Sequence, residues 1–369
     1  MRIALILLMA LHGLIHLLGF FNAFKWMELP ALTLPVGRVA GLFWLVAALL
    51  IWGAGLLLAG RRPWWPVVAL AAVAVSQALV IIYWQDASFG TIANVVILLV
   101  AVLAWGRYRF DRQVQAETEL LLSQAPAEPQ NDEVIGQAEL DRLPAPVRRW
   151  LLQSGVEGQP RPQTVYLEQR LRMQLQPTAK KWHKATAYQH FNLVEPGFLW
   201  RVDLPLFASL GIDGRDFYYQ GKGSMQMKLA SLFPIVNAGP DAELNEGAML
   251  RFLAEIIWFP AAALRPYLRW EAIDERRARA IFHHDGMKGE GIFTFSESGD
   301  FLRFSAHRFY NGGGAQRYLW VCTADEISEL GGHRIPSKAH VSWHLRDGEW
   351  TWLELEVTHL QYAIAGGRD

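Results

Sequence analysis

The chain has little cysteine, no net charge and no recognisable catalytic or metal motif, and each absence excludes a class of protein. Cys322 is the one cysteine among 369 residues, which excludes an intramolecular disulfide and a cysteine-based zinc site. Lys and Arg total 35 and so do Asp and Glu, so no overall charge attracts nucleic acid. The sequence also lacks a Gly-x-Ser-x-Gly elbow and a phosphate-binding glycine loop. We therefore expect no cofactor, no bound metal and no nucleic-acid partner.

Long hydrophobic runs are abundant in the first third of the chain. They span Ile3 to Phe24, Val39 to Ala59, Trp64 to Trp84 and Phe89 to Trp105. Roughly 20 apolar residues suffice to cross a bilayer as a helix. A cleaved secretory signal is disfavoured because the first run is too long and no small-residue cleavage site follows it. The sequence predicts a four-helix transmembrane domain over residues 1–107, and hence the lipid bilayer as a partner.

Basic residues near the ends of these runs predict the orientation of the membrane part. Six lie on the side of the two termini and two on the other side: Arg2, Arg61, Arg62, Arg107, Arg109 and Arg112 against Lys25 and Arg38. Cytoplasmic loops carry the excess of Lys and Arg. We expect a multi-pass protein of the bacterial cytoplasmic (inner) membrane with both termini in the cytoplasm. A reporter fused after Asp369 that is active only in the cytoplasm tests this orientation; activity restricted to the opposite side would contradict it.

The remainder of the chain predicts a juxtamembrane helix and linker over residues 108–136 and a soluble domain over 137–369. Apolar and polar residues alternate from Val165 onward, which is typical of half-buried strands. A long helix is expected from about Asp241 to Trp258, ended by Pro260. The predicted fold class is therefore a membrane four-helix bundle plus an α+β soluble domain, with a curved, half-barrel-like antiparallel sheet and one covering helix.

Several segments resemble a bacterial four-span membrane protein family of unknown function. They are His12 to Phe20, Trp84 to Asn94, Leu143 to Leu151, Leu250 to Pro260, and Arg334 to Pro336 with Trp343 and Asp347-Gly348. The soluble half is also distantly similar, in pattern, to lipoprotein carriers of the LolA type, in which a half-barrel holds acyl chains against a helix. That second resemblance implies lipid carriage. LolA-type carriers are periplasmic, whereas the charge count places this domain in the cytoplasm.

Polar side chains inside the predicted spans are candidates for function, because they are costly in a bilayer. His12 and His16 lie one helical turn apart in the first span, and Gln77 and Asn94 lie in the third and fourth. Hydrogen bonding between helices is the favoured interpretation. A proton or quinone site is the second, and a metal or haem site is the third.

The soluble domain supplies two further groups of candidates. Apolar and aromatic residues expected to line a ligand site are Trp200, Phe217, Tyr219, Met225, Met227 and Trp258. Arg251 and Glu255 have the spacing of an ordinary surface ion pair on a helix, for which a structural role is favoured.

Three functions are consistent with these features. The favoured hypothesis is binding of a lipid or another apolar small molecule by the soluble domain, because a single-layer sheet with one helix leaves apolar surface uncovered. The second is docking onto another membrane protein, for which an uncovered apolar patch would be the sign. The third, an enzyme acting on a membrane-soluble substrate through Arg251, Glu255 or a histidine pair, is ranked last.

Overall fold

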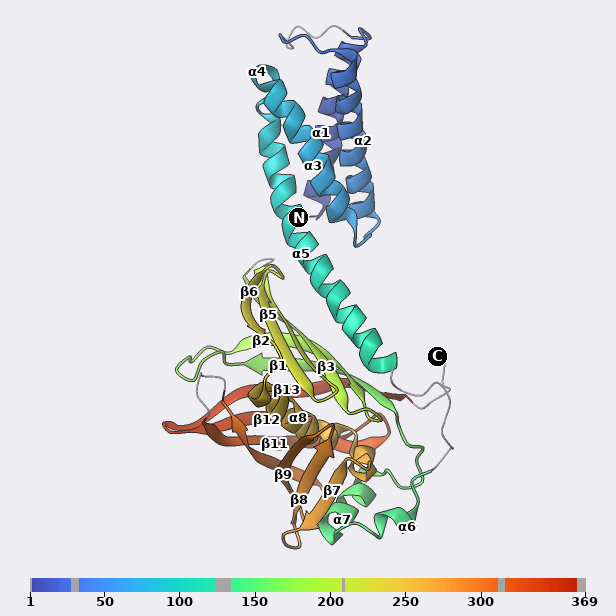
Figure 1. The fold of residues 1–369 in the computed structure, drawn as a ribbon, viewed down its shortest axis with the longest axis vertical. Helices are drawn as coiled ribbons and strands as arrows, with labels where there is room; N and C mark the ends of the chain where they lie inside the picture. Colours follow the sequence, from blue (N-terminus) through green and yellow to red (C-terminus); the bar gives the residue numbers. More distant parts are fainter. Residues whose placement is uncertain (1, 28–32, 124–133, 208–209, 311–315, 364–369) are drawn as a thin grey trace. The chain divides into compact units, whose positions relative to one another are not determined.

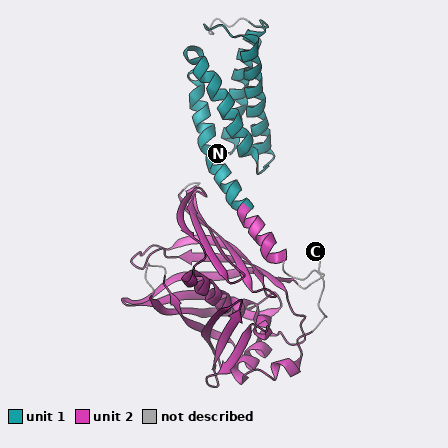
Figure 2. Cartoon of the chain, in the orientation of Figure 1, with its two compact units in different colours: residues 1–112 teal, residues 113–369 magenta. Residues whose placement is uncertain are grey.

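The computed structural model describes residues 2–27, 33–123, 134–207, 210–310 and 316–363. The chain divides into two compact units, residues 1–112 and 113–369 (Figure 2). Each unit is considered separately below. Of the predicted linker, the segment 124–133 lies outside the described residues.

The first unit is built from long apolar helices, as the hydrophobic runs predict. They are α1 (Arg2–Ala23), α2 (Arg38–Ala59), α3 (Trp65–Ile82) and the first part of α5 (Gly90–Ser123), with the short α4 (Trp84–Ala87) between α3 and α5. All four long helices have the length and hydropathy needed to cross a membrane. The four predicted membrane helices are therefore confirmed as helices.

Helix α5 differs from the expectation of a span followed by a separate juxtamembrane helix. It continues without interruption from Gly90 through Gly106 to Ser123. A single glycine inside a helix costs only about 1 kcal/mol. Polar pairs one turn apart follow it, such as Arg107 Nε with Asp111 Oδ2 at 3.2 Å. The change in composition after Trp105 therefore separates an apolar part and a polar part of one continuous helix.

The second unit contains one antiparallel sheet of 13 strands (Figure 1). The strands are β1 (Thr164–Met173), β2 (His183–Asn192), β3 (Gly197–Phe207), β4 (Leu210–Tyr219), β5 (Lys222–Leu229), β6 (Phe233–Ala238), β7 (Leu268–Ala272), β8 (Arg277–His284), β9 (Met287–Phe295), β10 (Phe301–Phe309), β11 (Arg317–Leu330), β12 (His333–Leu345) and β13 (Gly348–Ala363). Their order is β6-β5-β4-β3-β2-β1-β13-β12-β11-β10-β9-β8-β7, so strands adjacent in sequence are adjacent in the sheet and β1 joins β13. The predicted antiparallel sheet is confirmed.

Helix α8 (Ala242–Glu255) packs against one face of this sheet. Asp241 caps it by accepting a hydrogen bond from the backbone N–H of Leu244 at 2.7 Å. The helix contacts β4 and β5 near one edge of the sheet and β9 and β10 near the other. A sheet whose two ends reach the same helix must curve around it, as Figure 1 shows. Two short 3-10 segments, η1 (Ile256–Trp258) and η2 (Pro260–Leu264), continue the chain after the helix.

Two small helices precede β1 and pack on the core of the second unit. They are α6 (Gln137–Leu140) and α7 (Ala145–Ser154), the latter ended by Gly155 at φ 77°, a left-handed conformation that favours glycine. Trp150 of α7 is 2% exposed and stacks on Phe295 with ring centroids 5.4 Å apart. Aromatic residues of β7, β9 and β10 therefore form one buried cluster with Trp150 of α7.

Candidate functional site

The polar residues predicted inside the membrane helices form one hydrogen-bonded network. His12 Nε2 lies 2.9 Å from Asn94 Oδ1, and His16 Nε2 lies 2.8 Å from Ser76 Oγ. Asn94 Nδ2 donates to Gln77 Oε1 at 3.0 Å, and Ser76 Oγ donates to Asn94 Oδ1 at 2.9 Å. The network therefore links α1, α3 and α5 within the first unit. Such bonds between helices in a membrane are worth about 0.6–2 kcal/mol each.

Trp44 of α2 packs against the ring of His16. The rings of Trp44 and His16 lie 5.0 Å apart. A Cβ added at Gly19 would lie 2.6 Å from Trp44 Cδ2, so glycine is needed for this close approach. Ser76 is one of the few polar residues that the other spans offer. Its place beside the histidines, like that of Trp44, depends on how the helices pack.

A cavity of about 310 Å³ lies in the second unit. Its lining comes from α8 and η1 and from strands in both halves of the sheet. Six tryptophans contribute to it: Trp200, Trp258, Trp320, Trp343, Trp350 and Trp352. The volume is at the lower end of the range of small-molecule sites, which are mostly apolar with a few placed polar groups. The cavity is therefore the candidate ligand site.

Four of the six residues expected to line a ligand site are at this cavity. They are Trp200, Met225, Met227 and Trp258. Phe217 and Tyr219 are not among its lining residues; they stack on each other with centroids 5.9 Å apart. Side chains alternate between the two faces of a strand, and β4 contributes Asp216 to the cavity. Phe217 and Tyr219 therefore belong to the opposite face of β4, which corrects the expected set.

The ion pair expected on the surface of the long helix is buried instead, so that expectation was wrong. Arg251 Nε donates to Glu255 Oε1 at 2.9 Å, and Arg251 Nη1 donates to Asp216 Oδ2 at 2.7 Å. Gln189 Nε2 donates to Glu255 Oε2 at 2.7 Å. Burial raises the pKa of the Glu255 carboxyl, although the guanidinium of Arg251 opposes this. The pair is buried because the sheet curves over α8 and encloses its polar side chains.

Several lining residues were not among the sequence-based candidates. Arg308 of β10, Trp320 and Cys322 of β11 and Trp343 of β12 all face the cavity. Trp320 is paired directly with Trp343 across β11 and β12. Trp320 and Cys322 are two positions apart and therefore lie on the same face of β11. The sequence does not show that this face lines the cavity, because that depends on the register of the strands. Burial raises the pKa of the Cys322 thiol to about 12, so it remains protonated.

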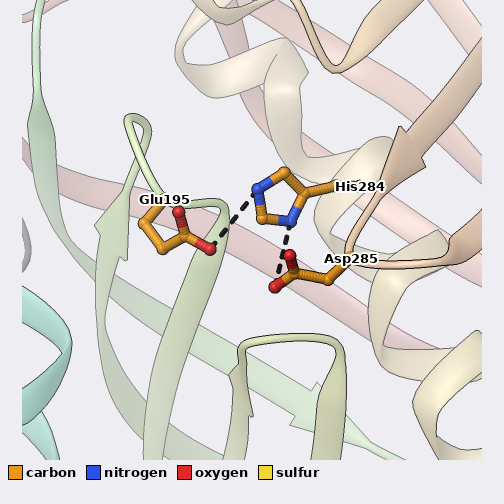
Figure 3. A group of neighbouring side chains, drawn as sticks. All are labelled: Glu195, His284 and Asp285. Carbon is orange, nitrogen blue, oxygen red and sulfur yellow. Dashed lines mark ion pairs between the residues drawn. The ribbon is translucent and has the colours of Figure 1, made fainter.

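A second cluster of titratable groups lies at the turns that follow β2 and β8 (Figure 3). His284 Nε2 lies 3.3 Å from Glu195 Oε1, and His284 Nδ1 lies 3.5 Å from Asp285 Oδ2. The three side chains are of the types that bind metal ions. However, the carboxylates approach different ring nitrogens, and a metal ion binds one nitrogen of a histidine. The two carboxylates therefore do not converge on one ring nitrogen, as a metal site would require.

Most of the second unit matches a known protein family. Residues 133–355, which are more than half of the chain, match the model of a family of unknown function, DUF6544. The chain belongs to this family. The resemblance to an uncharacterised family is therefore confirmed, and membership of DUF6544 assigns no activity to the cavity. Comparison with curated proteins gave no match.

A solved structure is similar to the C-terminal region of the chain. It is the crystal structure of a LolA superfamily protein from Nitrosomonas europaea, with 10% sequence identity and a TM-score of 0.33. The similarity covers 63% of this chain and 95% of that chain. A likeness at this level says nothing about a ligand. The cavity of the DUF6544 domain is therefore the feature that bears on its function.

Proposed function

We propose that the second unit binds a lipid or another apolar molecule in the tryptophan-lined cavity, and that the four apolar helices hold it at the bacterial inner membrane with both termini in the cytoplasm. The observation that carries this proposal is the cavity of about 310 Å³ with six tryptophans in its lining. Tryptophan offers a large apolar surface. Met225 and Met227 add flexible side chains that adapt to irregular ligands.

Attachment to membrane helices supports this function physically. Linking a binding module to its supply raises the effective concentration of the ligand without any new contact. A lipid-binding domain on a chain with four membrane helices meets its ligand at the surface of the bilayer. The same arrangement would give little advantage to a domain that binds a water-soluble metabolite.

Docking onto another membrane protein is the second candidate, and one surface feature favours it. Apolar side chains are exposed at the neighbouring ends of β3, β4 and β6, including Phe207 at 79%, Phe233 at 64% and Ile235 at 55%. Contiguous exposed apolar residues often mark an interaction site. The cavity nevertheless favours ligand binding, since a docking surface needs no enclosed volume.

Energy transfer to a fluorescent lipid tests the proposed function. The full chain in phosphatidylcholine nanodiscs is titrated with the methyl ester of dansylaminoundecanoic acid, and dansyl emission is recorded with tryptophan excitation. We expect saturable transfer from the lining tryptophans. Replacing Met225, which lines the cavity, by Asp should weaken binding at least tenfold, because an apolar ligand cannot compensate a buried carboxylate.

The neighbouring residue on the same strand provides the matched control. Gln226 is not among the residues lining the cavity, and its side chain bonds Asn237 on β6. Gln226→Asp should therefore bind the ester as the wild-type chain does. Transfer that never saturates, or that is equal in wild type and Met225→Asp, would reject ligand binding and leave docking as the stronger candidate.

A further inference from the structure

Arg308 of β10 is held in a defined position at the cavity. Its guanidinium carbon lies 4.9 Å from the ring centroid of Trp320 and 5.9 Å from that of Trp343. A Cβ added at Gly247 of α8 would lie 3.0 Å from Arg308 Nε, so the helix leaves space for this side chain. Two indoles and a glycine therefore fix the guanidinium where it lines the cavity.

No ion pair or hydrogen bond is found for this guanidinium within the described part of the chain. The carboxylates that attract it electrostatically are those of Asp216, Glu255 and Glu246. The first two form ion pairs with Arg251 and the third with Arg317. Burial lowers the pKa of Arg308 to about 10, so the side chain remains cationic at neutral pH. A half-buried cation without a direct ion pair among the described residues is costly, and an anion bound in the cavity would offset this cost.

Other polar groups of the cavity also require an acceptor. The indole N–H groups of Trp320 and Trp352 are buried without a hydrogen-bond partner among the described residues. By contrast, Trp200 Nε1 donates to Gln169 Oε1 at 3.0 Å. One acceptor, Asp216 Oδ1, also lacks a partner. Unsatisfied donors therefore outnumber unsatisfied acceptors, and a group rich in acceptor oxygens would complement the cavity.

We propose that Arg308 receives the anionic head of an acyl-chain ligand, a carboxylate or a phosphate, whose chain occupies the tryptophan-lined cavity. The inference rests on the proposed function and names the class of ligand for the same site. Guanidinium groups bind carboxylate and phosphate oxygens through two parallel hydrogen bonds. The apolar lining binds the chain, and Arg308 selects the head.

Asp216 and Glu255, which also line the cavity, reduce its affinity for an anionic head. Asp216 and Glu255 share Arg251, so these three groups carry one net negative charge, which partly compensates Arg308 and repels an anionic head. Burial raises the pKa of Glu255, so this carboxyl takes up a proton more readily than an exposed one and can offset the added charge. Glu255→Gln should therefore strengthen the preference for an anionic head.

Paired probes measure the preference in the full chain in phosphatidylcholine nanodiscs. Dansylaminoundecanoic acid and its methyl ester share the same chain and differ at the head, where the ester carries a methyl group in place of the charge, so the change that Arg308 substitutions make in the ratio of their Kd values reports the anion site. In the wild-type chain the acid should bind about tenfold to a hundredfold more tightly, as expected for a charge-assisted hydrogen bond. Arg308→Gln should bring the ratio to near one, and Arg308→Lys should give an intermediate ratio.

Arg303 on the same strand is the matched control, because it is exposed and is not among the residues lining the cavity. Arg303→Gln should keep the wild-type ratio. Equal affinity of acid and ester in the wild type, or a ratio that Arg308→Gln and Arg308→Lys leave unchanged, overturns the anion site and leaves the proposed function intact. Failure of both probes to bind overturns the proposed function itself. Displacement of the acid by dodecyl phosphate or by laurate at concentrations at least about tenfold below those at which dodecanol displaces it supports the site, and comparison of the two anions distinguishes the heads.

Discussion

Replacing Arg251 by Met should destabilise the second unit by about 3–5 kcal/mol, because it leaves two buried carboxylates without their shared cation. Asp216 and Glu255 have side chains only 3% and 10% exposed. The same substitution removes the guanidinium that stacks on Phe198 and Trp200 at 4.8 and 4.7 Å. Near-UV circular dichroism of the full chain during urea unfolding measures the loss.

The sign of the pH dependence follows from the same carboxylates. Without Arg251, the pKa of Glu255 in the folded state rises further above its unfolded value, so protonation favours folding. The deficit of the Arg251→Met variant should therefore shrink as the pH falls towards the folded pKa and grow as the pH rises.

Arg317 provides the control for this substitution. It forms an ion pair with Glu246, but its own side chain is 49% exposed, and such surface pairs contribute about 0–1 kcal/mol. Arg317→Met should therefore change stability little. Equal losses in the two variants, or a loss that does not depend on pH, would contradict the buried-cluster account.

Much of the architecture could be predicted from the sequence because it depends on local patterns. Uninterrupted hydrophobic runs specify membrane helices, and period-two alternation specifies strands. The continuity of α5 was not predicted, because the change in composition after Trp105 resembles a boundary, while the helix passes through Gly106 at little cost. A change from apolar to polar residues can therefore occur within one helix and does not by itself mark its end.

The site could be predicted only in part, for reasons of geometry. Alternation separates Phe217 and Tyr219 from Asp216 on β4, but it does not say which face of a curved sheet is concave. Trp200 and Met225 were identified from their aromatic and flexible side chains. Arg308 could not be placed, because its neighbours Trp320 and Trp343 come from other strands and meet it only through the register of the sheet.

Filling the cavity with a larger side chain should abolish ligand binding. Ala254 of α8 lines it and is 2% exposed, so a tryptophan at this position must project into the space that a ligand would use. Overpacking of this kind costs about 1–3 kcal/mol, which the fold can tolerate. Ala254→Trp should therefore remain folded and lose its ligand. Near-UV circular dichroism checks that the variant is folded.

Ala242 at the start of the same helix gives the matched control. It is exposed and is not among the residues lining the cavity, so Ala242→Trp adds the same indole without occupying the site. Comparison of the two variants separates the effect of filling the cavity from the effect of adding a tryptophan to α8.

Native mass spectrometry of the full chain, released from its own membrane, tests ligand binding most directly. The account predicts a stoichiometric adduct with the mass of one acyl-chain molecule on the wild-type chain and on Ala242→Trp, and its loss from Ala254→Trp. A wild-type chain that carries no adduct, or an adduct that persists when Ala254→Trp fills the cavity, would contradict the claim that this cavity holds a lipid.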